Sequence, residues 1–434
     1  MRLSSVSLLL GGLTALVHAA GFADLAAQLP ACGLECVQSA IPNSPCELTN
    51  STCLCTDQTF AGLTQQCVAK SCTVKESLTM LRLQNLACGV PVKSQQVRFK
   101  IHAIAACIIA EICVIMRLFS KIHILGKLGP EDYLIIVAGL ATVPYLYCHC
   151  TLADLGFGLN IWDVVPFANL YQLLKIFWID QMLYSVHLYS TKLSILCFLA
   201  GIFPSRSFKN VTIGLAIFVA LSGAATLITT GLQCLPASYN YSSWDGESKG
   251  HCNDLNSQTY AFGGINMACD LAIVVMPLHE LYRLQVSGRQ KIQLFVIFSL
   301  GIIVTVFSII RLPFLVTLGK TTNPTWDYVE VTIWSIWETE LGMVCASLPA
   351  IRHLFKHMFP NALSTIVAKM TSATGSKGTG YDQSGSWAPS RSRGNGSKAD
   401  KKDYYELDER SLIGRGPEGA NPNASRTNIE TSHS

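Results

Sequence analysis

Charged residues are scarce in this sequence of 434 residues: aspartate, glutamate, lysine and arginine together make up 14%, while half of the residues are hydrophobic. A soluble globular chain carries about 25% charged residues. The shortage is concentrated between residues 101 and 350. This composition argues against a single soluble enzyme domain and indicates a membrane-embedded middle with more polar regions on either side.

Two further features are missing. The net charge is only +4, and no basic stripe with interleaved aromatic residues occurs, so no nucleic-acid partner is expected. The chain also lacks a Gly-rich phosphate loop, a zinc-hydrolase motif and a Ser-His-Asp order. We therefore expect a protein that is not an enzyme.

Residues 1–19 have the features of a secretory signal peptide. Arg2 precedes an apolar stretch that is shorter than the about 20 residues needed to span a bilayer, and Val17 and Ala19 stand where a signal peptidase reads small residues. We expect cleavage after Ala19, so that the mature chain starts outside the cell. The alternative, an uncleaved anchor, is disfavoured by the short length of the stretch.

Cysteine is concentrated near the N-terminus. Of the 17 cysteines, eight lie between Cys32 and Cys88. An even number at this density is typical of a small extracellular module, here residues 20–95, because so small a core needs disulfides for stability. Four disulfides are predicted, but spacing alone leaves their pairing open.

The cysteine order, led by Pro30, is Cys-x3-Cys, Cys-x6-Cys-x-Cys, Cys-x4-Cys and a last Cys, and it resembles the fungal CFEM domain from Pro30 to Cys88. The resemblance implies a helical module with the pairs Cys32–Cys72, Cys36–Cys67, Cys46–Cys53 and Cys55–Cys88.

Asp57 is the candidate metal ligand of this module. Some CFEM domains bind ferric haem through an aspartate two residues after the fifth cysteine, and Asp57 holds that position. A carboxylate is a hard anionic ligand that favours Fe(III). Alternatively, Asp57 caps a helix that begins at Gln58, and the two roles are compatible. Six apolar residues either line a haem pocket or form the core of the module: Phe60, Leu63, Leu78, Met80, Leu81 and Leu83.

Residues 98–351 contain seven apolar stretches that are long enough to cross a membrane: 101–119, 132–150, 173–200, 211–233, 260–278, 292–318 and 330–350. With the N-terminus outside, the basic residues gather in the predicted cytoplasmic loops, including Arg206, Lys209, Arg283 and Arg289. This bias predicts a plasma-membrane protein with an extracellular N-terminus and a cytoplasmic C-terminus. Asn50 and Asn240 begin sequons on the predicted outer side and are candidate glycosylation sites.

Four segments of this region resemble the fungal rhodopsin-like integral membrane domain: 156–163, 192–196, 270–277 and 348–352. With the cysteine module, the chain resembles fungal CFEM-bearing seven-helix receptor-like proteins, a family linked to sensing host surfaces and proposed to signal through G proteins. The third predicted span ends in Gly201 to Arg206 without an Asp/Glu-Arg-Tyr triplet, so G-protein coupling is implied by the resemblance alone. No lysine stands in the middle of the seventh span to carry retinal.

Ionisable residues within the spans are the candidate site, because charges inside a bilayer are costly. We expect Arg311 to pair with Asp180, Asp270 or Glu338, with Glu340 nearby, in a ligand pocket that opens outward beside Trp334 and Trp337. A structural ion pair that fixes helix register and a transport relay are the alternatives. A disulfide between Cys234 and Cys252 is expected to form a lid over this pocket.

Residues 352–434 are polar and rich in Gly and Ser, which predicts a mostly disordered cytoplasmic tail. The predicted fold is all-α: a small disulfide-stapled extracellular module, a seven-helix transmembrane bundle and this tail. The favoured function is a G-protein-coupled-receptor-like sensor of extracellular or host-derived cues, with the bilayer, an unidentified extracellular ligand and a G protein or other cytoplasmic protein as partners. Haem or iron acquisition at the cell surface is the alternative, and a virulence effector or adhesin acting through the module is a further one.

Overall fold

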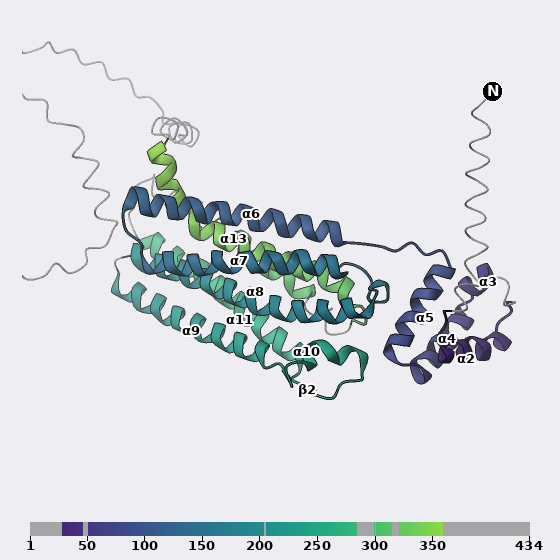
Figure 1. The fold of residues 1–434 in the computed structure, drawn as a ribbon. Helices are drawn as coiled ribbons and strands as arrows, with labels where there is room; N and C mark the ends of the chain where they lie inside the picture. Colours follow the sequence, from purple (N-terminus) through teal and green to yellow (C-terminus); the bar gives the residue numbers. More distant parts are fainter. Residues whose placement is uncertain are drawn as a thin grey trace, which may run out of the picture.

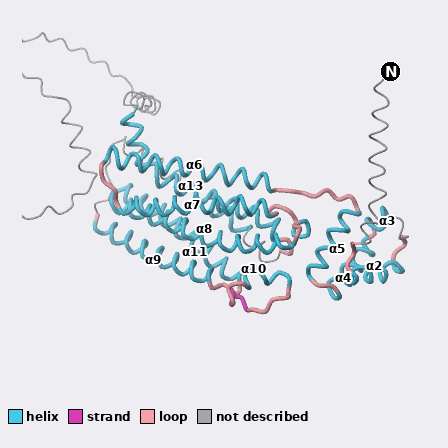
Figure 2. Tube along the Cα trace, viewed as in Figure 1, coloured by secondary structure: helices cyan, strands magenta, loops and turns pink. Residues whose placement is uncertain are grey.

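The computed structural model describes residues 28–46, 51–203, 205–283, 299, 301–314 and 321–358. The predicted signal peptide, the sequon at Asn50 and the tail beyond residue 358 lie outside these described residues. Within them the chain is almost entirely helical, and the strands are two residues long (Figure 2). The all-α fold expected from the sequence is confirmed.

The N-terminal module, here called the ectodomain, consists of short helices: α2 (Ala31–Ala40), η1 (Ile41–Asn43), α3 (Ser51–Thr56), α4 (Gln58–Ser71) and α5 (Val74–Ala87). Side chains in the sequence start two of them. Asp57 accepts a hydrogen bond from the backbone N–H of Thr59 at the start of α4, and Thr73 and Glu76 form a capping box at the start of α5. The buried core is small, with Leu54 and Phe60 in one cluster and Val68 and Met80 in another.

Long helices form a bundle beside the ectodomain (Figure 1): α6 (Gln96–Phe119), α7 (Pro130–Leu155), α8 (Phe167–Ile202), α9 (Arg206–Gly231), α11 (Leu255–Arg283) and α13 (Pro324–Met358). By length and composition, α6 with its extension η2 (Ser120–Leu125), α7, α8, α9 and α11 can each cross a membrane. A shorter apolar helix, Gly301–Phe314, lies in the sixth predicted span, and α13 covers the seventh.

The outer surface of the bundle is apolar, as a lipid-facing surface must be. Large apolar side chains point outward from α6, α7 and α9; Ile115, Leu140 and Leu221, for example, are 63%, 70% and 66% exposed. Inside, Phe99, Tyr145, Phe157 and Ile336 belong to one buried cluster that joins α6, α7, α8 and α13. Apolar faces toward lipid and packed faces toward the centre are the pattern of a membrane bundle.

The loop between α7 and α8 ties the ends of three helices together. The backbone N–H of Gln95 donates to the carbonyl of Gly158 over 2.8 Å, and the N–H of Gly158 donates to the carbonyl of Thr325 over 2.9 Å. Gly158 has φ +99°, and a Cβ there would lie 2.9 Å from the backbone nitrogen of Gln96. Glycine is therefore required where this loop meets the starts of α6 and α13.

A second loop covers the same end of the bundle. The strands β1 (Cys234–Leu235) and β2 (His251–Cys252) pair antiparallel, and a disulfide joins Cys234 to Cys252. Between them lie the short helices α10 (Tyr239–Ser242) and η4 (Ser243–Asp245). Of the two candidate glycosylation sites, Asn240 lies within the described residues. Its side-chain amide donates to the carbonyl of Ala237 over 2.9 Å.

Candidate functional site

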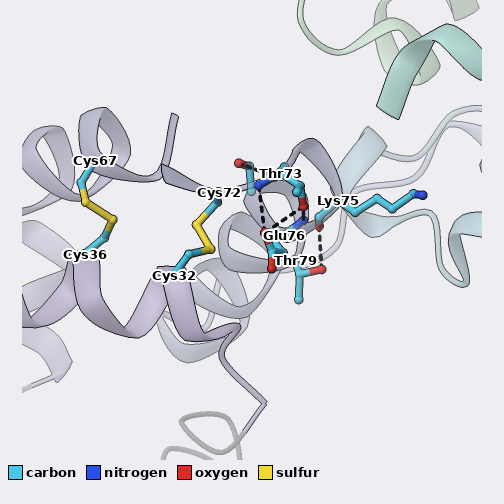
Figure 3. The surroundings of a disulfide bond; sticks show 9 residues. Cys32, Cys36, Cys67, Cys72, Thr73, Lys75, Glu76 and Thr79 are labelled. Atoms are coloured by element: carbon cyan, nitrogen blue, oxygen red, sulfur yellow. Dashed lines mark hydrogen bonds between the residues drawn. A yellow bond between two sulfur atoms is a disulfide. The ribbon is translucent and has the colours of Figure 1, made fainter. Parts of the chain in front are cut away.

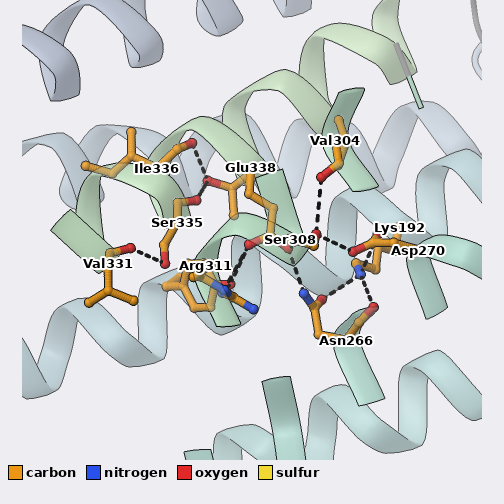
Figure 4. A network of polar contacts seen from close by, with 12 residues as sticks. Lys192, Asn266, Asp270, Val304, Ser308, Arg311, Val331, Ser335, Ile336 and Glu338 are labelled. Atoms are coloured by element: carbon orange, nitrogen blue, oxygen red, sulfur yellow. Dashed lines mark hydrogen bonds and ion pairs between the residues drawn. The ribbon is translucent and has the colours of Figure 1, made fainter. Parts of the chain in front are cut away.

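A network of buried charges joins α8, α11, the helix Gly301–Phe314 and α13 (Figure 4). Arg311 Nη1 lies 3.0 Å from Glu338 Oε2, and Lys192 Nζ lies 2.7 Å from Asp270 Oδ1. All four side chains are less than 10% exposed. We call this set, with the bridging residues described next, the ion network.

Neutral side chains bridge the two ion pairs. Asn266 accepts from Lys192 Nζ over 2.6 Å and donates to Glu338 Oε1 over 2.7 Å. The hydroxyl of Ser308 lies 2.5 Å from Glu338 Oε1 and 2.9 Å from Asp270 Oδ2. Two cations and two carboxylates therefore share one hydrogen-bonded network in which the charges balance.

The sequence left the partner of Arg311 open among three acids, and the structure places Glu338 against it. Asp180 and Glu340 lie elsewhere, in a second buried cluster with two histidines. His149 Nδ1 is 3.3 Å from Asp180 Oδ1, and His187 Nε2 is 3.9 Å from Glu340 Oε1. The five predicted pocket residues are thus divided between two separate environments.

A cavity of about 60 Å³ lies next to the ion network. Lys192, Asp270 and Glu338 line it together with apolar residues, and it extends along α8 to Leu199 and along α13 to Cys345. The ectodomain contacts the other end of the bundle, the one predicted to be extracellular. The cavity therefore extends toward the predicted cytoplasmic side, and not toward the extracellular side as was expected from the sequence. A volume of this size holds a few water molecules.

The two tryptophans expected beside the pocket point in other directions. Trp337 Nε1 donates to His102 Nδ1 on α6 over 3.2 Å. The ring of Trp334 packs against Phe307, with ring centroids 5.2 Å apart. Neither residue lines the cavity.

Buried charges at the far end of the bundle were missed by the sequence analysis. Arg117 Nε and Nη2 lie 2.9 Å and 2.7 Å from Asp132 Oδ1, and both side chains are fully buried. Arg117 also donates to the backbone carbonyl of Ala346. This ion pair, in which two nitrogens of Arg117 contact one carboxylate oxygen, fastens α6 to α7, and the bond to Ala346 fastens α6 to α13. Its residues stand at the margins of the apolar stretches, where the sequence gives no sign of burial.

In the ectodomain the disulfides join Cys32 to Cys72, Cys36 to Cys67, Cys46 to Cys53 and Cys55 to Cys88. These are the partners that the CFEM resemblance implies. Figure 3 shows two of them beside the capping box of α5. The bonds Cys32–Cys72 and Cys36–Cys67 connect α2 to the C-terminal part of α4, and Cys55–Cys88 connects α3 to the residue after α5.

Asp57 is partly exposed and strongly hydrogen-bonded. The hydroxyl of Ser44 donates to Oδ2 over 2.5 Å, and the N–H of Thr59 donates to Oδ1 over 2.9 Å. The hydrogen bond from Ser44, assisted by those from Thr59 and Phe60, lowers the pKa of the Asp57 carboxyl. Asp57 is therefore an ionised helix cap with lone pairs that remain available to a further ligand.

The surroundings of Asp57 fit a haem in part. Its anionic, accessible carboxylate has the donor chemistry that ferric iron prefers. Of the six apolar residues considered for a pocket, Phe60, Met80 and Leu83 are buried in the core and Leu78 packs against the bundle. Leu63 is 37% exposed and can contact a flat apolar ligand.

The ectodomain contacts the loops of the bundle through α5. Leu78 packs with Trp162 and Trp244 against the buried cluster of Ile161, Val164 and Leu170. Lys75 Nζ lies 2.9 Å from Glu247, 3.1 Å from Asp245 and 5.9 Å from the centre of the Trp244 ring. The hydrogen bond to Glu247 is the main cause of a raised pKa at Lys75, and the hydrogen bond to Asp245 is the second. One face of α5 thus lies on both loops that cover the bundle.

These features define a multi-helix membrane protein with a disulfide-bonded N-terminal module. Family models match both parts: the CFEM domain over residues 25–89 and the fungal rhodopsin domain over residues 116–357. The chain belongs to the fungal rhodopsin domain family and carries a CFEM domain before the bundle. Neither family description names an enzymatic activity.

Three relatives illustrate the two parts. A SAT4 family membrane protein of Emericella nidulans is 31% identical over 233 residues, which cover 53% of this chain and 57% of that protein. The receptor GIN3 of Arthrobotrys oligospora is 22% identical over 280 residues, or 63% and 66% of the two chains. The GPI-anchored hemophore RBT5 of Candida albicans is 41% identical over 70 residues, or 16% and 29%. No solved structure matches the chain.

Proposed function

We propose that this protein is a receptor-like sensor of the plasma membrane, with the ectodomain outside the cell and the C-terminal tail inside. The observation that carries the proposal is the contact of α5 with both outer loops. Leu78 reaches residues of the loop between α7 and α8, and Lys75 reaches residues of the disulfide-closed loop between α9 and α11. A change in the ectodomain can therefore displace the loops that hold the helix ends. A relative is named a receptor, which supports this class of function.

The cytoplasmic partner in this proposal is a heterotrimeric G protein, contacted through the predicted inner loops. Arg206 stands at the start of α9 and Lys209 follows in its first turn. The test uses the full chain in lipid nanodiscs, a panel of heterotrimeric G proteins and a nucleotide-exchange assay. We expect exchange with one G protein, and we expect Arg206→Ala with Lys209→Ala to reduce it at least tenfold.

A chain that lacks residues 20–95 is the comparison that tests sensing. If the ectodomain controls the bundle, its removal changes the basal exchange rate. Equal rates with and without it would show that the ectodomain does not act on the bundle. Absence of exchange with every G protein would reject this partner, and the effect of residues 20–95 on hydrogen exchange in α13 would then test sensing alone.

Haem capture is a second candidate function, favoured by the ionised and accessible carboxylate of Asp57 and by relatives that are named hemophores. In this role Asp57 would hold the ferric iron, and Leu63 is an exposed apolar residue of the helix that Asp57 caps, which could contact a flat ring. Haem would supply a redox-active iron whose reduction weakens binding by a hard carboxylate.

The test separates the ligand role of Asp57 from its capping role. The full chain in nanodiscs is titrated with ferric haemin and followed by the Soret band. Asp57→Asn keeps an N-cap acceptor for Thr59 but removes the anionic ligand, whereas Ser44→Ala keeps the carboxylate. We expect saturable one-to-one binding that is lost in Asp57→Asn and retained in Ser44→Ala. Retention in Asp57→Asn would leave Asp57 as a helix cap only.

A further inference from the structure

The second buried cluster of the bundle contains acids and histidines without a basic partner. Its members come from three helices: Tyr145 and His149 from α7, Asp180 and His187 from α8, and Glu340 from α13. Every one of them is at most 4% exposed. We call these five residues the histidine–carboxyl cluster.

The cluster is built as two similar pairs. His149 lies 3.3 Å from Asp180 across the interface of α7 and α8, and His187 lies 3.9 Å from Glu340 across that of α8 and α13. The ring of Tyr145 lies between them, with its centre 4.1 Å from that of His149 and 6.0 Å from that of His187. Each pair therefore joins a different pair of helices.

The hydrogen-bonding capacity of the cluster is incompletely used. Both ring nitrogens of His149, Nδ1 of His187, Oδ1 of Asp180 and Oε2 of Glu340 are buried without a hydrogen-bond partner. The remaining contacts are weak: Thr142 Oγ1 lies 3.3 Å from His187 Nε2, and Cys107 Sγ lies 3.6 Å from Glu340 Oε1. Such groups are costly inside a membrane unless they bind something.

Positive charge is what the cluster lacks. In the ion network Arg311 and Lys192 balance the two carboxylates, but among the described residues no lysine or arginine forms an ion pair with Asp180 or Glu340. The titratable groups that face the cluster add no basic charge either; they are Cys107 and Glu111 of α6, Cys148 of α7 and Tyr184 of α8. Two carboxylates and two neutral imidazoles need two positive charges for neutrality.

Protons fit this geometry better than a metal ion. A metal ion needs three or more ligand atoms close together. In the described part of the chain, the group that meets this condition is Cys32, Cys72 and Glu76, and its cysteines are disulfide-bonded. The two pairs of the cluster are instead separated by the Tyr145 ring, and one proton, carried by either the imidazole or the carboxyl group, can neutralise the charge of each pair.

We propose that the histidine–carboxyl cluster is a proton-binding site that holds two protons, one in each pair. Each proton is taken from water and is released to water when the pair loses it. Loss of a proton leaves a carboxylate uncompensated at a helix interface, so the packing of α8 against α7 and α13 changes with protonation. This site responds to protons whether or not the ectodomain binds a ligand.

The experiment uses the full chain in lipid nanodiscs and infrared difference spectra across about pH 4 to 9, the range in which carboxyl and imidazole groups titrate. Protonated carboxyl groups and imidazolium rings have separate bands. We expect one pH-dependent signal to be lost in Asp180→Asn and another in Glu340→Gln, because each isosteric change removes one pair. Asp270→Asn combined with Lys192→Met, which removes both charges of one ion pair of the ion network, is the control and keeps both signals.

Two outcomes would overturn the proposal. Signals that persist in both cluster variants would place the titrating groups elsewhere. One equivalent of a divalent metal in the purified chain, lost in His149→Ala and in His187→Ala, would make the cluster a metal site instead. Thermal unfolding of each variant identifies any that fail to fold, and nitrogen NMR of labelled histidines in the unaltered chain then reports the protonation of the imidazoles directly.

Discussion

The ectodomain and the bundle hold their helices together by different means. In the ectodomain four disulfides join helices of 6 to 14 residues around a few buried side chains. In the bundle the described helices α6 to α9, α11 and α13 have 24 to 36 residues, and buried ion pairs cross between helices. Water drives apolar burial but lipid does not, so a small domain in water needs covalent links and a bundle in lipid depends on packing and polar contacts.

The largest loss of stability is expected when one partner of a buried ion pair in the bundle is removed and the other is left behind. Arg311→Met leaves Glu338 buried without its cation, and loss of one partner of a buried pair costs about 3–5 kcal/mol. Adding Glu338→Gln removes the stranded charge and keeps the acceptor for Asn266, so much of the stability should return. Unfolding is measured with a thiol-reactive dye, which labels buried cysteines such as Cys107 as the bundle opens.

Arg98→Met is the control for this prediction. Arg98 also forms an ion pair, with Glu330 at 2.6 Å, but its side chain is 50% exposed. Exposed pairs contribute less than about 1 kcal/mol. A double variant no more stable than Arg311→Met, or an equal loss in Arg98→Met, would contradict the distinction between buried and exposed pairs.

A slightly smaller effect is expected in the ectodomain. Replacing Cys36 and Cys67 by alanine removes a disulfide that closes 31 residues, at a cost of about 2–5 kcal/mol. Hydrogen exchange of the full chain should show loss of protection in α2 and α4, while α8 keeps its protection. Cys113→Ala, at a free cysteine of α6, is the control and should leave α2 and α4 unchanged. Exposure of α8 in the disulfide variant would mean that the two regions unfold as one unit.

The difference between a disulfide-linked ectodomain and a bundle held by packing and buried charges also explains what could be predicted from the sequence. Membrane helices are visible in sequence because each depends on the composition of one continuous window. The helix start at Gln58 was predictable because it depends on the neighbouring residue Asp57, and the start at Val74 likewise depends on neighbours, Thr73 and Glu76, although no prediction was made there. Cysteine spacing left the pairing open, and the pairs came from resemblance to a family rather than from the residues alone.

The partners of the buried charges could not be predicted, because depth in a helix does not give direction. Glu338 and Glu340 differ little in depth, but two residues rotate a helix by about 200°, so they face opposite sides of α13. One meets Arg311 and the other meets His187. His149 stands between two cysteines in the sequence, and a single histidine gives no sign of a site until its spatial neighbour Asp180 is known.

A moderate effect is expected at the capping box of α5. Thr73→Ala removes an N-cap side chain and should cost about 1 kcal/mol. Two hydrogen bonds lower the pKa of Glu76 in the folded state: the larger contribution comes from the backbone N–H of Thr73 and the smaller one from its hydroxyl. Their contribution to stability is therefore present above the unfolded pKa of about 4.3 and is lost as the pH falls through the lower folded pKa.

Hydrogen exchange in the first turn of α5, compared at equal pH, measures this prediction. The difference between the unaltered chain and Thr73→Ala should shrink below about pH 4, where the glutamate becomes protonated. Thr79→Ala is the control, because the Thr79 hydroxyl bonds to the Lys75 carbonyl within the same helix and caps nothing. A difference that stays constant with pH would mean that Glu76 does not contribute.

The smallest change in stability is expected at the contact between the ectodomain and the bundle. Lys75→Ala removes ion pairs to Asp245 and Glu247 but leaves Leu78 against the bundle, so the ectodomain should stay attached and move more. Because the Debye length falls from about 8 Å at physiological salt to about 3 Å at 1 M, raising the salt weakens these ion pairs and should make the unaltered chain resemble the variant. Spin labels on α4 and α9 would report the change as a broader distance distribution.

Lys70→Ala is the matched control for this contact. Lys70 lies in the last turn of α4 and forms no ion pair with any described residue, so its removal should leave the distances unchanged at every salt concentration. Leu78→Asp tests the apolar part of the contact and should broaden the distances regardless of salt. If Lys75→Ala and Leu78→Asp both left the distribution unchanged, the ectodomain would not be held by α5, and the route by which it could act on the bundle would be lost.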